Sequence, residues 1–318
     1  MTRPFLYVST VIRGACDGDM TGFFYKVDWR SRGIVEKIPV PSRAAGVFGS
    51  RGGSRGGRGI SVFGDTVYAA TFDKILMFDR QFLPRKAISH PLVLGHHELQ
   101  ADATGIWCCS TLIDGVIRLT HEGDLLEACF LCEEDALLAS GVKRVARDRM
   151  GNYLAQARDD TESARFEEQL HINTVTADRD AGTVVVWATN TSHLVQVRPH
   201  VEILAHMPHL RSSHNVQLVG DDIFVNHTRA GAFQIYSRDD LTTPRAHVDL
   251  DGRDTPSEQF ATSGWIRGLC WVARDLIVVG TSPAGLISID LNTMTVVDRL
   301  QLETDVRHAV HGLASDAK

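Results

Sequence analysis

Short runs of alternating apolar and polar residues extend along the chain, separated by polar turns that contain Gly or Asp. Alternation with a period of two is typical of a β-strand whose two faces have different surroundings. The clearest stretch contains four such runs, at residues 97–103, 105–111, 115–120 and 124–131. The pattern predicts an all-β protein built from four-stranded units.

These units recur at intervals of roughly 40 residues, which is the repeat length of a β-propeller blade. The first strand of each unit is preceded or opened by a cationic or imidazole side chain. These side chains are Arg58, His97, His171, His214, Arg267 and His311. Innermost strands line the central channel of a propeller, so one such residue in each blade predicts a ring of six around the axis.

The two ends of the chain complete the count of blades. Residues 5–12, 22–28 and 33–41 form three strands without an inner one, and a lone inner strand begins at His311. Joined, they make a sixth blade, and this closure removes the exposed sheet edges. We therefore predict a six-bladed β-propeller that forms a single domain over residues 1–318.

Two stretches do not fit the repeat. The charged residues 133–170 are either an insertion over one propeller mouth or a degenerate seventh blade. We favour the insertion, because only two of four strands can be found there. The Gly- and Arg-rich residues 46–59 are predicted to form a mobile loop beside the channel mouth. They lack the Gly-Lys-Ser/Thr of a phosphate-binding loop, and an RNA-binding role is disfavoured by the acidic remainder of the chain.

Composition narrows the class of partner. A net charge of −6 in 318 residues argues against nucleic acid and membrane surfaces as partners. No apolar stretch approaches the roughly 18–20 residues of a membrane span, and the start does not resemble a signal peptide. Six cysteines without a disulfide-like or zinc-like framework fit free thiols in the reducing cytoplasm. Cys129 and Cys132 have C-x-x-C spacing, but no second pair accompanies them.

The ring suggests a metal centre beside an anion clamp. Three histidines can hold a divalent metal and leave a coordination position open, and we expect His97, His171 and His214 to do so, with His311 as a fourth ligand. Zinc, iron and copper are all compatible with imidazole ligands. Arg58 and Arg267 carry planar donor forks that suit a carboxylate or phosphate. A buried histidine that only bonds water or carbonyls is the simpler alternative for any single member.

Neighbouring residues have supporting roles in this hypothesis. Glu98 follows His97 and is expected to act as general base or to orient a ligand, with a solvated charge at the mouth as the alternative. Asn173 is placed toward the channel, and Trp265 either walls the pocket or packs. His96 replaces His97 as ligand if the register slips by one residue.

The blade pattern resembles the six-bladed propeller superfamily of NHL-repeat, strictosidine-synthase-like and gluconolactonase-like proteins. The strand openings HELQ, HINT and HNVQ resemble an uncharacterised bacterial family with His-x-Asn strand starts. The ring is similar to that of peptidyl-hydroxyglycine lyase propellers, which carry zinc on three channel histidines with arginines nearby. Gluconolactonase-type enzymes hold calcium through Glu, Asn and Asp, and the His-dominated ring departs from that pattern.

These observations lead to two hypotheses. The first is a metal-dependent lyase or hydrolase, with an iron or copper oxygenase as a further possibility, acting on a small anionic substrate held by Arg58 and Arg267. The second is a propeller that binds a ligand or a partner protein without catalysis, since the fold alone does not decide function.

Overall fold

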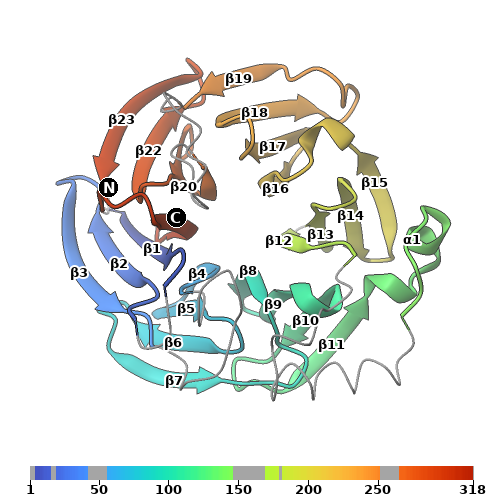
Figure 1. Ribbon diagram of the computed structural model, residues 1–318, viewed down its shortest axis with the longest axis horizontal. Coiled ribbons are helices and arrows are strands. Elements are labelled where there is room, and N and C mark those ends of the chain that lie inside the picture. The colour runs from blue at the N-terminus through green and yellow to red at the C-terminus, as the bar shows by residue number, and fades with distance from the viewer. Residues whose placement is uncertain are drawn as a thin grey trace.

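The computed structural model describes residues 4–15, 19–41, 56–145, 169–178, 181–250 and 265–317. The described residues form six four-stranded antiparallel sheets arranged as blades around a central axis (Figure 1). The predicted six-bladed β-propeller is confirmed. None of the helices in the described ranges is long and apolar enough to cross a membrane.

The blades are numbered in chain order, and their strands run from the axis outward. Blade 1 contains β24 (His308–Ser315), β1 (Phe5–Ile12), β2 (Phe23–Asp28) and β3 (Gly33–Pro39). Blade 2 contains β4 (Ile60–Phe63), β5 (Thr66–Ala70), β6 (Ile75–Asp79) and β7 (Pro84–Ile88). Blade 3 contains β8 (His96–Asp102), β9 (Gly105–Ser110), β10 (Gly115–Leu119) and β11 (Leu125–Phe130).

The second half of the ring repeats this order. Blade 4 contains β12 (Ile172–Asp178), β13 (Thr183–Ala188), β14 (His193–Arg198) and β15 (Glu202–His206). Blade 5 contains β16 (His214–Val219), β17 (Asp222–His227), β18 (Ala232–Ser237) and β19 (Ala246–Asp249). Blade 6 contains β20 (Arg267–Ala273), β21 (Leu276–Gly280), β22 (Gly285–Asp290) and β23 (Thr295–Gln301).

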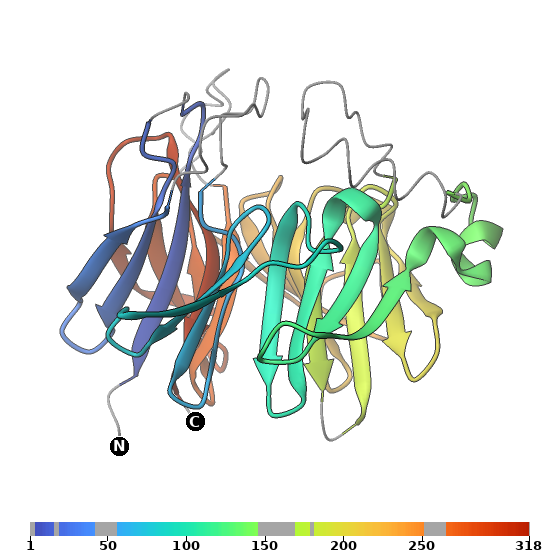
Figure 2. The ribbon, with the colours of Figure 1, turned by 90° about the horizontal axis from the view of Figure 1, so that it is seen from below.

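Blade 1 is closed by both ends of the chain, as predicted. Strand β24 pairs antiparallel with β1, from Ile12 opposite His308 to Leu6 opposite Ser315. The closing strand begins at His308 rather than at His311, because its pairing with β1 already starts there. The two ends of the chain lie on the same face of the disc (Figure 2). Since all inner strands run in one sense, their first residues gather at the opposite face.

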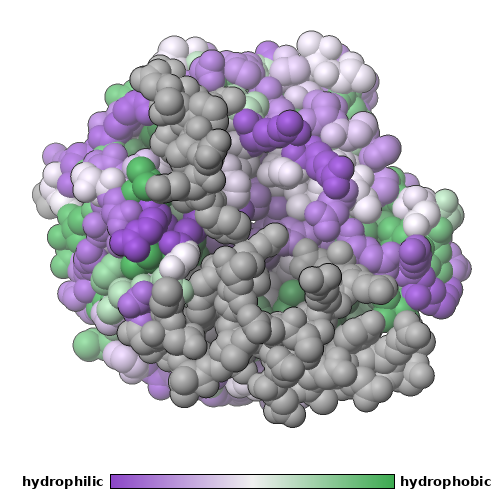
Figure 3. Space-filling model, viewed as in Figure 1, coloured by the Kyte–Doolittle hydropathy of each residue, from purple (hydrophilic) through white to green (hydrophobic). Residues whose placement is uncertain are grey.

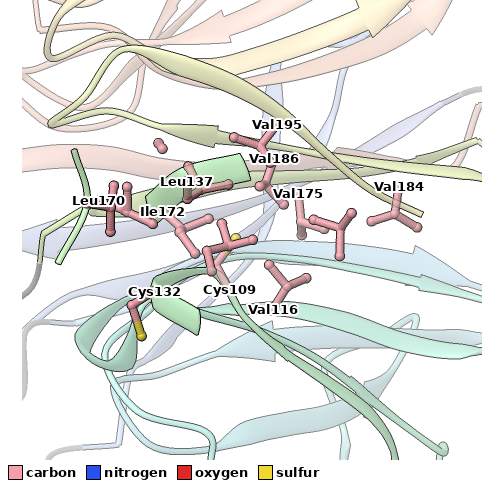
Figure 4. Packing of buried hydrophobic residues seen from close by; sticks show 14 of the residues in the cluster. Cys109, Val116, Cys132, Leu137, Leu170, Ile172, Val175, Val184, Val186 and Val195 are labelled. Carbon is pink, nitrogen blue, oxygen red and sulfur yellow. The ribbon is translucent and has the colours of Figure 1, made fainter. Parts of the chain in front are cut away.

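Adjacent blades pack their apolar faces directly against each other. Between blades 3 and 4, Cys109 and Val116 lie in one cluster with Val175 and Val186 (Figure 4). Burial of such side chains stabilises the ring by about 1.5–3 kcal/mol for each large residue. Because these two blades touch, the described residues leave no further blade between them.

Residues 133–145 of the proposed insertion follow the outer strand of blade 3. Three 3₁₀-helices, η1 (Thr111–Ile113), η2 (Leu131–Glu133) and η3 (Pro208–Leu210), occur within or between blades 3 to 5. After η2, the short helix α1 (Asp135–Ala139) lies outside β15 (Figure 1). The remainder of the proposed insertion, residues 146–168, and most of the proposed mobile loop, residues 46–55, lie outside the described residues.

Candidate functional site

Four histidines from four blades lie together at the axis. The ring centroid of His97 is 4.6 Å from that of His171, 5.1 Å from that of His311 and 6.3 Å from that of His214. Arg58 joins the group, since its Nη1 lies 2.9 Å from Nε2 of His311. The structure therefore brings together side chains that are separated by more than 250 positions in the sequence.

Close approach between inner strands makes this cluster compact. The backbone N–H of Gly59 donates to the carbonyl of His97 in the next blade at 2.9 Å. A Cβ at Gly59 would lie 2.6 Å from Cα of Glu98, and one at Gly312 would lie 2.6 Å from the carbonyl oxygen of Arg58. Such distances are too short for any side chain, so glycine is required where these strands pass each other.

The approach to His171 is held by an aspartate from blade 3. The carboxylate of Asp114 accepts hydrogen bonds from the backbone N–H groups of Gln169, Leu170 and His171 at 2.8, 3.1 and 3.2 Å. His171 itself has φ of 52°, in the left-handed region that non-glycine residues rarely adopt. Three charge-assisted bonds from one buried carboxylate offset this local cost.

The hydrogen bonds of His214 fix its tautomer. Its Nδ1 lies 2.8 Å from Oγ1 of Thr228, and this hydroxyl donates to the carbonyl of Ile266 at 2.9 Å. A hydroxyl has only one proton, so Thr228 must accept from Nδ1–H of His214. Nε2 of His214 then carries a lone pair, and this buried atom has no hydrogen-bond partner in the structure. A histidine oriented in this way suits a metal ligand or a general base.

His311 has the opposite arrangement. A guanidinium has no acceptor, so Arg58 donates to Nε2 of His311, and the proton of the neutral ring resides on Nδ1. This Nδ1 is buried and has no hydrogen-bond partner in the structure. In this state His311 presents a donor, whereas His214 presents a lone pair.

Burial keeps these imidazoles neutral. His97, His214 and His311 are 8%, 7% and 3% exposed, and burial lowers the pKa of each ring well below its usual value. Positive charge adds to this effect, from Arg58 at His311 and from Arg267 at His214. These rings therefore stay uncharged near pH 7. The positive charge that could hold an anion comes from the arginines beside them.

Glu98 is in an environment that favours the acid over the carboxylate. Burial raises the pKa of its carboxyl well above the usual value, and its buried Oε1 has no hydrogen-bond partner in the structure. A general base must be a carboxylate, whereas a proton donor must be the acid. The environment of Glu98 therefore favours the role of proton donor.

One cationic side chain of the site was not found from the sequence. The guanidinium carbon of Arg13 lies 4.1 Å from the ring centroid of Trp265, and that of Arg267 lies 4.8 Å from the same ring. Arg13 follows directly after β1, which pairs with the closing strand. The pairing of β1 with β24 could have identified Arg13, because it places the end of β1 beside the start of the closing strand.

Other residues considered for the site have local roles. Asn173 donates from Nδ2 to the carbonyl of Ser213 at 2.9 Å and thus joins blades 4 and 5. His96 is fully buried, and burial together with Arg58 lowers its pKa to about 3. Burial raises the pKa of Cys129 and Cys132 to about 12 and about 11, so both remain thiols. All five cysteines in the described ranges are free, and Cys16 lies outside them.

Within the described ranges, no group of three or more His, Cys, Asp or Glu side chains is arranged to hold a metal ion. The four rings are close, but their nitrogen atoms do not converge on one point. Nε2 of His311 is engaged by Arg58. On the face shown in Figure 3, the described residues above and to the right of the centre are mostly hydrophilic.

No known family model and no curated protein matches this chain. Solved structures show the same fold. One is a protein of unknown function from Bacteroides caccae, at 10% identity and a TM-score of 0.57, with 99% of both chains covered. Another belongs to a nidogen/laminin complex, at 8% identity and a TM-score of 0.59, with 98% of both chains covered.

A third is a putative 6-phosphogluconolactonase from Bacteroides uniformis, at 10% identity and a TM-score of 0.50. The match covers 96% of this chain and 84% of that one. At these identities the likeness shows the propeller fold alone. The fold is shared by a protein named as an enzyme and by one solved in a protein complex, so function must be argued from the channel.

Proposed function

We propose that the end of the channel formed by the inner-strand openings binds a small anionic molecule and is the site of its conversion. One observation carries the proposal: the guanidinium of Arg58 lies beside His311, and the buried, neutral rings of His311 and His97 lie 5.1 Å apart at the axis. Arg58 and Arg267 supply the charge that holds the anion. The imidazoles supply a lone pair at His214 and an N–H donor at His311.

The anion-binding part is tested by thermal unfolding in the presence of small carboxylates and phosphates. A ligand that binds only the folded protein raises its melting temperature as the ligand concentration rises. We expect such a rise in the wild type and its loss in Arg58→Gln and Arg267→Gln. An equal rise in all three proteins would overturn the proposal.

We further propose that the conversion is a metal-dependent lyase or hydrolase reaction, with zinc, iron or copper on His97, His171 and His214. The fixed lone pair of His214 and the ring distances of 4.6 and 6.3 Å support this set. Rotation of His97 or His171 is needed for the nitrogen atoms to converge. We do not include His311, because Arg58 occupies its Nε2.

Metal content of protein purified without an affinity tag or chelator tests this set. We expect about one equivalent by mass spectrometry, lost in His97→Ala and in His214→Ala and retained in His311→Gln. Protein that takes up no metal after reconstitution would refute metal dependence.

A metal-free binding channel is the second candidate function. It is favoured because, in the described parts of the chain, no group of His, Cys, Asp or Glu side chains is arranged to hold a metal ion. In that case the same anions bind with unchanged affinity in His97→Ala, whereas a metal-dependent site would lose affinity together with its metal.

A further inference from the structure

A further pair of histidines lies outside the channel, on the two outer strands of blade 4. His193 opens β14, and His206 ends β15 directly opposite it in the antiparallel pairing of these strands. Residues in this relation have Cβ atoms about 4.5–5.5 Å apart, which lets two imidazoles reach one ion. The register of this hairpin thus brings together two strong metal ligands that the channel does not use.

The pair lies on the face of blade 4 that is turned toward blade 3. Side chains alternate along a strand, so His193 shares its face with Val195 and Val197. These valines pack in the cluster between blades 3 and 4, where Val195 is seen in Figure 4. His193 is 7% exposed, whereas His206 is an exposed residue. One ring is therefore inside the blade and the other is at the surface, where an ion from solvent can reach it.

The two rings have the separation of a pair that binds one metal ion. Their centroids are 4.6 Å apart, and their planes are inclined by 42°. Two imidazoles that bind a metal at about 2.0–2.1 Å, in neighbouring coordination positions, have centroids roughly 4.5–5.2 Å apart. The strands therefore already hold the rings of His193 and His206 at the distance that a shared ion requires.

Both rings are available as ligands. Nδ1 of His193 is buried and has no hydrogen-bond partner in the structure. Among the described residues, His206 has no hydrogen bond or ion pair, and its one ring contact is with His193. Burial, with His206 nearby, lowers the pKa of His193, so that this ring is neutral near pH 7. A neutral imidazole is the form that binds a metal.

We propose that His193 and His206 form a metal site at the outer edge of blade 4, which binds a divalent late transition metal such as zinc or nickel. Imidazole nitrogen suits these ions, whereas magnesium and calcium prefer oxygen ligands. No group of three or more His, Cys, Asp or Glu ligands exists in the described ranges, so water completes the coordination and the ion exchanges with solvent. The bound ion joins β14 to β15. This inference is independent of the proposed function of the channel.

Isothermal titration of zinc into the full chain, first stripped of metal by a chelator, tests the site. We expect the wild type to bind an equivalent of zinc that is lost in His206→Gln and in His193→Gln. His206→Gln is the main variant, because this exposed side chain is not part of the core. His200→Gln is the matched control and should keep the zinc. His200 is an exposed histidine in the turn of the same hairpin, with Nε2 3.3 Å from Glu202.

Thermal unfolding gives a second measurement on the same proteins. Zinc that binds only the folded chain should raise the melting temperature of the wild type and of His200→Gln as its concentration rises. The rise should be smaller in His206→Gln, and magnesium should give none. The melting temperatures without metal show whether each variant is folded.

The outcomes separate this site from the channel. Zinc binding that is absent from the wild type, or unchanged in His206→Gln, would overturn the inference. An equal loss in His200→Gln would indicate diffuse attraction of zinc to the hairpin and would overturn it too. If zinc is lost in His97→Ala and kept in His206→Gln, the ion belongs to the channel and the inference is wrong. If the equivalent lost in His206→Gln is kept in His97→Ala, the inference stands whether or not the channel binds a metal.

Discussion

The hydroxyl of Thr228 is predicted to set the protonation pattern of His214. Thr228→Val keeps the shape of the side chain and removes the one group that joins Nδ1 of His214 to the carbonyl of Ile266. Two buried polar groups then lose this partner, at a cost of about 1–3 kcal/mol each. We expect a loss of about 2–6 kcal/mol of stability. For a chain of this size this corresponds to a fall of roughly 3–9 °C in melting temperature.

Nitrogen-15 NMR of the histidine rings gives the more specific result. In the wild type, His214 should be a single neutral tautomer with its proton on Nδ1. In Thr228→Val the two tautomers should be mixed, and Thr228→Ser, which keeps the hydroxyl, should resemble the wild type. A wild-type His214 with its proton on Nε2, or a Thr228→Val protein with unchanged tautomer and stability, would refute the reasoning.

Three further predictions follow from the same contacts. Because His97, His214 and His311 have pKa values below that of an unfolded histidine near 6.5, their contribution to stability is complete above pH 6.5 and is lost as pH falls below it. Well below pH 6.5, each ring changes the free energy of unfolding by about 1.4 kcal/mol per pH unit. Urea unfolding at pH 6.5 and 5.5 should therefore show a smaller pH dependence of stability in His311→Gln than in the wild type. An unchanged pH dependence would contradict this. Asp114→Ala removes the acceptor of three backbone N–H groups and should cost about 2–4 kcal/mol in urea unfolding, with a smaller loss in Asp114→Asn. Deleting residues 308–318 leaves β1 without its partner, and size-exclusion chromatography should show aggregates instead of a folded monomeric peak, which a normal elution profile would disprove.

The architecture was accessible from the sequence because each blade repeats one hydrophobic pattern. The alternation fixed which residues face neighbouring blades, and the unpaired runs at the two ends predicted the closure of β24 on β1. Repetition also brought His97, His171, His214 and His311 together. A period in the sequence identifies equivalent positions, and equivalent positions in a closed ring are neighbours in space.

What escaped the sequence depends on single hydrogen bonds and on register. Arg13 follows the second strand of its blade, outside the repeated inner-strand position, and its guanidinium contacts Trp265. The bond from Arg58 to His311, which removes a ring nitrogen from the expected metal ligands, requires side-chain directions that periodicity does not give. The effect of burial on Glu98 likewise depends on how closely blades 2 and 3 approach at Gly59.

The most direct test of anion binding at the axis is a crystal of the wild-type protein soaked with selenate, a tetrahedral dianion whose selenium is located by anomalous scattering. We expect an anomalous peak in the channel within hydrogen-bond distance of the guanidinium groups of Arg58 and Arg267, and none there in the Arg58→Gln protein. Selenate bound only on the outer surface, with the channel unchanged, would contradict the proposed function.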